Sequence, residues 1–129
     1  MTTQQKCILQ TENLNKWFPA ARTLNNRFRK RYIKALNNVS LQIFEGETLG
    51  IVGESGCGKT TFGRTVIRLE EPTSGSIFFN GKDITDYNHQ EMLSIRREMQ
   101  MIFQDTYASL DPRMRIGDSI AEPLDIQKT

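Results

Sequence analysis

The sequence predicts an α/β fold with an additional antiparallel β portion. A short apolar run at 49–52 is typical of a strand buried on both faces. A glycine-rich stretch at 53–60 follows it, and a helix face then begins, marked by Phe62, Thr65, Val66 and Leu69. Pro72 is expected to end that helix. The alternating run Val39–Ile43 and the Asn80-Gly81 pair add a half-buried strand and a hairpin.

Residues 53–60 read GESGCGKT, a full match to the phosphate-binding pattern G-x-x-x-x-G-K-[ST]. Its glycines permit backbone angles at which successive N–H groups converge on one anion, and the free N–H groups of the following helix face the same point. The lysine is expected along the β- and γ-phosphates, and the threonine hydroxyl on Mg²⁺. The sequence therefore predicts a nucleoside triphosphate site at Gly53, Glu54, Ser55, Gly56, Cys57, Gly58, Lys59, Thr60 and Thr61.

Length and composition indicate one ordinary globular domain of soluble character. The 129 residues are 37% hydrophobic and 25% charged, with a net charge of +2 that is too small to indicate nucleic-acid binding. No apolar run approaches the length of a membrane span, and the first residues lack a secretory signal. Two cysteines, one inside the phosphate-binding loop, favour a reducing cytoplasm. The single histidine, His89, lies in a polar stretch and is expected on the surface.

The remaining elements are expected in order along the chain. A first strand at 7–13 is expected to end in a turn at 14–19, and an irregular insertion with seven basic and no acidic residues is expected at 13–35. The alternative for this insertion is a patch that touches RNA or a membrane surface. Asn88 and Glu91 form the pattern of a capping box that opens a helix to Met99.

Two further elements complete the expected order. Residues 101–103 predict a short apolar strand that ends in Gln104-Asp105, and 116–124 predict a helix that stops before Pro123 or just past it.

Four stretches resemble one family, the ATP-binding subunits of ABC transporters, and most closely those of oligopeptide and dipeptide importers. They read LNKWFP, then ALNNVSLQIFEGETLGIVGESGCGKTTFGRTVIRLEEPTSGSIFFNGKDI, then IRREMQMIFQD, and finally YASLDPRMRIGDSIAEPL. The last two are more specific than the phosphate-binding loop, because other nucleotide-binding proteins have no reason to carry them. The resemblance implies a P-loop fold of the ABC ATPase type, with residues 1–129 as its N-terminal part.

The resemblance also implies roles for individual residues. The loop 53–60 looks like the Walker A motif of the segment 49–69, and Gln104, within the segment 100–124, looks like the glutamine that touches Mg²⁺ and water. The metal ligands are then Thr60 and Gln104. Such proteins stack an aromatic ring on adenine, which points to Phe18, with Trp17 and Tyr32 as alternatives. ATP and Mg²⁺ are the implied ligands.

Several motifs of that family do not occur in the sequence. No LSGGQ-like signature, no apolar strand ending in Asp-Glu, and no switch histidine is found, so no catalytic residue is assigned and ATP hydrolysis by this chain is not expected. The sequence is interpreted as a fragment of an ATP-binding subunit. A truncated remnant without catalysis, a subunit serving nickel or another solute, and a P-loop kinase or GTPase are the alternatives.

The resemblance implies partners as well. A second ATP-binding subunit and the transmembrane permease subunits are expected in the intact transporter, which places the protein on the inner face of the cell membrane without insertion into it. No nucleic acid is expected as a partner.

Overall fold

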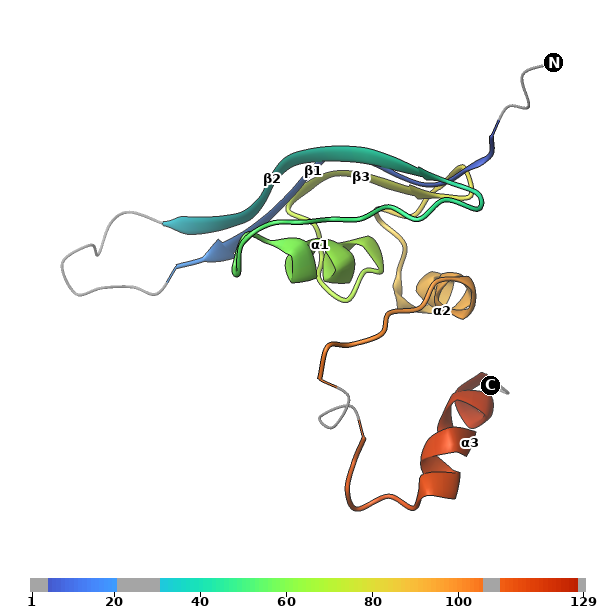
Figure 1. Cartoon of the computed structure of the whole chain (residues 1–129). Coiled ribbons are helices and arrows are strands. Elements are labelled where there is room, and N and C mark those ends of the chain that lie inside the picture. The colour runs from blue at the N-terminus through green and yellow to red at the C-terminus, as the bar shows by residue number, and fades with distance from the viewer. Residues whose placement is uncertain (1–4, 21–30, 106–109, 128–129) are drawn as a thin grey trace.

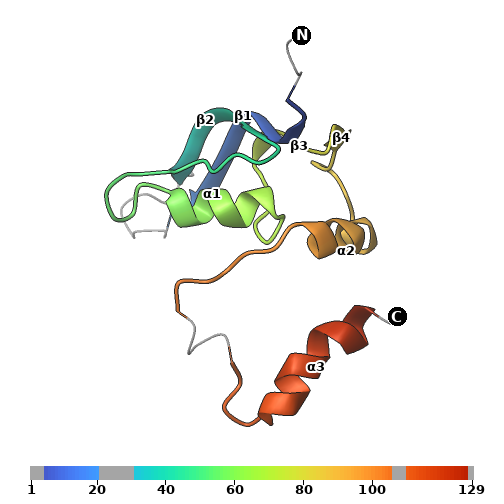
Figure 2. The same ribbon diagram turned by 45° about the vertical axis from the view of Figure 1, so that its right-hand side comes forward.

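A computed structural model describes residues 5–20, 31–105 and 110–127. Four antiparallel strands form one sheet in the order β2-β1-β3-β4. One face of this sheet is covered by α1, α2 lies next to α1, and α3 projects away from the sheet (Figures 1 and 2). The elements are β1 (Cys7–Pro19), β2 (Tyr32–Phe44), α1 (Lys59–Val66), β3 (Ser74–Phe79), β4 (Lys82–Asp83), α2 (His89–Glu98) and α3 (Ile116–Gln127).

The first two strands are longer than their sequence patterns indicated. The predicted turn at 14–19 is wrong, because β1 continues through it and pairs with β2 as far as Pro19, opposite Tyr32. The pairing is irregular here, with shifts in register between residues 11 and 16. Leu14 lies within this irregular stretch, and its side chain is fully buried in the core. The predicted irregular insertion 13–35 is therefore strand at both flanks, and its middle, 21–30, lies outside the described residues.

The hairpin predicted at Asn80-Gly81 is confirmed. Both residues have positive φ, +48° and +77°, as a two-residue turn between right-handedly twisted strands requires. Beyond β4, the hydroxyl of Thr85 accepts a hydrogen bond from the N–H of Ile77 at 2.8 Å. This bond ties the connection after the hairpin to β3.

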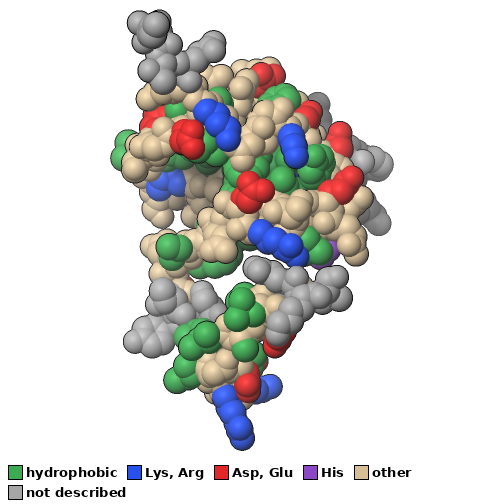
Figure 3. Space-filling model, turned by 90° about the vertical axis from the view of Figure 1, so that its right-hand side faces the viewer, with side chains coloured by type: hydrophobic (Ala, Val, Ile, Leu, Met, Phe, Trp, Pro, Cys, Tyr) green, Lys and Arg blue, Asp and Glu red, His purple; other side chains and the backbone are tan. Residues whose placement is uncertain are grey.

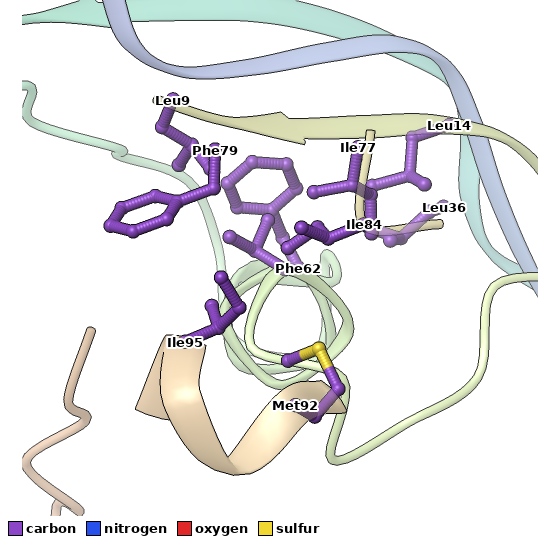
Figure 4. Close-up of a cluster of buried hydrophobic side chains, with 10 residues drawn as sticks. Leu9, Leu14, Leu36, Phe62, Ile77, Phe79, Ile84, Met92 and Ile95 are labelled. Carbon is purple, nitrogen blue, oxygen red and sulfur yellow. The ribbon is translucent and has the colours of Figure 1, made fainter. Parts of the chain in front are cut away.

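The core lies between the sheet, α1 and α2 (Figure 4). The sheet contributes side chains from β1, β2 and β3, α1 contributes Phe62 and Val66, and α2 contributes Met92 and Ile95. The buried hydrophobic residues of this cluster are Leu9, Leu14, Leu36, Phe62, Val66, Ile77, Phe79, Ile84, Met92 and Ile95.

Two strands that the sequence predicted are wrong. Residues 49–52 and 101–103 have no strand structure, and Val52 and Ile102 are each 93% exposed. An apolar run becomes a strand only where a neighbouring strand supplies hydrogen bonds and apolar layers cover it. Among the described residues, no strand pairs with either segment. The antiparallel portion of the predicted fold is thus confirmed, whereas no parallel sheet forms within the described ranges.

The helices begin where the sequence predicted and differ in where they end. The first, α1, stops at Val66, and Arg68 then takes a φ of +55°, so Leu69 is 48% exposed and not part of the buried helix face. The capping box of α2 is confirmed: the Asn88 side chain accepts from the Glu91 N–H at 3.0 Å, and the Glu91 carboxylate accepts from the Asn88 N–H at 2.7 Å. His89 is exposed, as expected.

The last helix, α3, extends to Gln127, beyond the end that was expected near Pro123. Pro123 lies inside α3, because a proline removes one hydrogen bond but has a φ close to the helical value. Ile116, Ile120 and Leu124 lie on one face at a spacing of four residues and are all exposed. Hydrophobic side chains accordingly gather on the lower lobe in Figure 3. In the described ranges, no helix is both long and apolar enough to cross a membrane.

Candidate functional site

The phosphate-binding loop lies at the N-terminus of α1 and rests against the start of β2. Gly58 is the N-cap of α1 with a φ of +103°, and a Cβ on it would lie 2.4 Å from the carbonyl oxygen of Ala35. Only glycine fits this contact. The close packing of the loop on the sheet therefore fixes where the helix begins.

The helix N-terminus at this loop carries no compensating negative charge. No side chain caps it, and its first turn holds no acidic residue. The free N–H groups and the positive end of the helix dipole therefore remain available to an anion.

Lys59 folds back over the loop that precedes it. Its Nζ donates to the carbonyl oxygens of Gly53 at 2.6 Å and Glu54 at 2.7 Å, and it lies 3.5 Å from Sγ of Cys57. The ammonium group thus bridges two carbonyl groups of the loop, so that the loop backbone surrounds one positive charge. An ammonium group in this place carries the charge and the donors that pair with phosphate oxygens.

Gln104 lies on the same cleft as the loop residues. An open cleft of about 700 Å³ is lined by Lys59, Thr60, Arg64, Met101, Ile102, Phe103, Gln104 and Asp105. The structure therefore brings the predicted metal ligands Thr60 and Gln104 to one surface, although 44 positions separate them in the sequence. A hydroxyl and an amide oxygen are donors that suit Mg²⁺.

The other predicted residues of the loop are not among those that line this cleft. Glu54, Ser55, Gly56 and Cys57 are exposed in the loop itself. The half-buried Thr61 uses its carbonyl oxygen to accept a bond from the Thr65 hydroxyl at 2.7 Å.

The predicted adenine-stacking residue, Phe18, is not among the described residues that line the cleft. It is half-buried near the end of β1, and the Nζ of Lys16 lies 4.9 Å from the centre of its ring. The alternatives Trp17 and Tyr32 contact each other with ring centroids 6.4 Å apart, and Lys34 lies 4.9 Å over the Trp17 ring. All three residues belong to the end of β1 and the start of β2, and the phosphate-binding loop contacts the same part of β2 through Gly58 and Ala35. Figure 1 shows these strand ends near the start of α1.

Two charged residues of the cleft were missed from the sequence. Arg64 lies one helical turn after Thr60, so the helix period could have placed both on one face. Asp105 follows Gln104 directly and adds a carboxylate to the cleft. Together they put one cation and one anion beside the predicted ligands.

Comparisons with known proteins agree with this geometry. The model of the ABC transporter family matches residues 36–128. The oligopeptide transport ATP-binding protein OppF of Bacillus subtilis is 55% identical over 97 residues, covering 74% of this chain and 32% of OppF. The dipeptide transport ATP-binding protein DppF of Lactococcus lactis is 47% identical over 125 residues, covering 95% of this chain and 38% of DppF. The chain spans about a third of the length of these relatives.

Solved structures show the same likeness. The dimeric structure of MJ0796, a bacterial ABC transporter cassette, has a TM-score of 0.73 at 28% identity and covers 92% of this chain and 47% of that one. A post-hydrolysis state of MJ0796 bound to ADP and Pi has a TM-score of 0.60 at 31% identity, over 70% of this chain and 35% of that one. The family match contains both the phosphate-binding loop and Gln104. This chain therefore belongs to the ABC transporter family.

Proposed function

We propose that this chain binds Mg-ATP in the cleft between α1 and residues 101–105. The observation that carries the proposal is the meeting of Lys59 and Thr60 with Gln104 on one surface. The uncapped start of α1 and the ammonium of Lys59 fit a polyphosphate, because both offer positive charge and N–H donors to anionic oxygens. When bound, Mg²⁺ would neutralise phosphate charge.

Four residues have a defined part in this proposal. Lys59 leaves the carbonyl oxygens of Gly53 and Glu54 and pairs with phosphate oxygens. Thr60 and Gln104 would hold Mg²⁺ through their side-chain oxygens. Phe18 offers a ring face to adenine, and stacking there requires that the Lys16 ammonium share or leave that ring.

The role in the cell that we propose is that of an ATP-binding protein that energises import of oligopeptides or dipeptides. Its support is the identity of about half of the aligned residues to OppF and DppF, whose names state oligopeptide and dipeptide transport. In that role the chain acts with a second ATP-binding subunit and with permease subunits at the inner face of the membrane. Nickel or another solute in place of peptides is the alternative that uptake measurements would decide.

Binding of a fluorescent ATP analogue, with Mg²⁺ and with EDTA, tests the proposed site. We expect Lys59→Ala to abolish binding, since it removes the only charge that spans the loop carbonyls in the described structure. Lys82→Ala is the matched control, because Lys82 is an exposed lysine on β4 and should bind as the wild type does. Equal affinity of the Lys59→Ala variant and the wild type would contradict the site. Phosphate release above the Lys59→Ala background would contradict the expectation that this chain does not hydrolyse ATP.

A further inference from the structure

The end of β1 carries two pairs of a lysine and an aromatic ring, one on each face of the sheet. Lys16 and Phe18 are two positions apart in the strand and therefore project to the same face, where the ammonium lies 4.9 Å from the centre of the Phe18 ring. Trp17 projects to the other face, where Lys34 lies 4.9 Å from the centre of its ring and Tyr32 contacts it. The two pairs are chemically alike, so their positions relative to the phosphate-binding loop distinguish them.

The pair of Lys16 and Phe18 lies on the face that carries the phosphate-binding loop. Lys16 is the cross-strand partner of Leu36, and directly opposite residues of an antiparallel pair project to the same face. The Leu36 side chain is buried in the core between the sheet and α1 (Figure 4), and its Cδ2 lies 3.5 Å from the place that a Cβ on Gly58 would take. Phe18 then follows about 7 Å further along β1, on the same face as the loop.

Lys16 is held in place by the connection between α1 and β3. Its ammonium donates to the carbonyl oxygen of Glu71 at 2.7 Å and pairs with the Glu70 carboxylate at 3.2 Å, and 13% of its side chain is exposed. An ammonium that left this place would lose both oxygen partners, whereas a nucleobase needs only one face of an aromatic ring. Because the ammonium covers one face of the Phe18 ring, the opposite face is the one that a base can use.

We propose that Lys16 is a positioning residue for the base of a bound nucleotide. Its cation–π contact fixes the orientation of the Phe18 ring from one face, and the base stacks on the opposite face. Trp17 and Tyr32 do not stack on the base, because they project from the face of the sheet that lies away from the loop. The inference rests on the proposed function, because it concerns the base of the same nucleotide whose phosphates meet Lys59.

Two ligands separate the base from the phosphates, namely ATP and inorganic tripolyphosphate, which has a similar charged chain and no base. Isothermal titration calorimetry with Mg²⁺ measures both affinities. We expect Phe18→Ala to weaken ATP binding about tenfold and Lys16→Ala about fivefold, and both variants to bind tripolyphosphate within about twofold of the wild type. Lys34→Ala is the matched control, since it removes an equal charge at the same distance from the neighbouring ring, and it should change both affinities by less than about twofold.

Combined and conservative variants distinguish a positioning role from a general structural one. In Phe18→Ala, the additional change Lys16→Ala should cause no further loss of ATP affinity, because the ring that Lys16 positions is absent. Lys16→Arg should retain most of the ATP affinity, since a guanidinium also stacks on an aromatic face. If circular dichroism shows that Lys16→Ala does not fold, Lys16→Gln carries the test, because it keeps an amide donor for the Glu71 carbonyl and removes the charge.

Three results would overturn the proposal. The first is ATP affinity equal to or tighter than that of the wild type in folded Lys16→Ala, or in Lys16→Gln in its place, since a lysine that only blocks the ring would weaken binding. The second is an equal loss for ATP and tripolyphosphate, and the third is the same loss of ATP affinity in Lys34→Ala. A failure of the proposed function would appear separately, as tripolyphosphate binding that does not depend on Lys59, whereas ATP binding that depends on Lys59 and not on Lys16 would refute this inference alone.

Discussion

Replacing Gly58 by alanine tests the contact between the phosphate-binding loop and the sheet. Gly58 has a φ of +103°, and the new Cβ would lie 2.4 Å from the carbonyl oxygen of Ala35, a backbone atom that cannot rotate away. A left-handed backbone angle costs an L-residue about 1–3 kcal/mol, and a methyl group forced into a packed contact costs about 1–3 kcal/mol. We therefore expect Gly58→Ala to lower the free energy of unfolding by roughly 3 kcal/mol.

Alanine substitutions at two other glycines separate the cost of the left-handed backbone angle from the cost of the contact with Ala35. Gly56 has a φ of +81° but no atom within 4 Å of the place that a Cβ would take, so Gly56→Ala should show only the cost of the angle, about 1 kcal/mol. Gly50 has neither a left-handed φ nor a neighbour within 4 Å, so Gly50→Ala should change stability by less than about 0.5 kcal/mol. Urea unfolding followed by circular dichroism measures all three. Equal stability of Gly58→Ala and Gly56→Ala would refute the contact with Ala35.

The structure supports three further predictions. Ile77 is fully buried between the sheet and the helices, so Ile77→Ala should lower the unfolding free energy by about 3 kcal/mol in the same urea assay, whereas Ile102→Ala should change it little. Asn88→Ala removes one half of the capping box and should cost about 1 kcal/mol and reduce the helix signal of circular dichroism; an unchanged signal and stability would contradict the cap. The Asp83 carboxylate accepts hydrogen bonds from the side chain of Thr85 and, as the smaller effect, from its backbone N–H, and both lower the pKa of Asp83 from its usual 3.8. The ionised carboxylate therefore stabilises the fold at neutral pH. The stability deficit of Asp83→Ala should therefore be present at pH 7 and disappear as the pH falls below 3.8; a deficit that persists in acid would contradict this.

Local patterns in the sequence were sufficient for the elements whose forces are local. The capping box at Asn88 and Glu91, the turn at Asn80-Gly81 and the loop at 53–60 each formed where they were predicted. In each case the side chains and glycines that set the backbone angles lie within a few positions of the groups that they satisfy. The family resemblance was also confirmed, because it depends on motifs and their order along the chain, which the sequence contains in full view.

Only the tertiary structure decided the features that depend on residues distant in the sequence, namely which strands form and where Gln104 lies. The runs at 49–52 and 101–103 have the composition of buried strands, yet they remain unpaired in the described chain, because a strand exists only with a neighbour. Conversely, 14–19 looked like a turn and became strand because β2 offered a partner of matching length. The sequence by itself determined the phosphate-binding loop and its helix, whose chemistry is contained in one short stretch. Only tertiary packing placed Gln104 on the same cleft as Thr60, because 44 positions separate the two residues in the sequence.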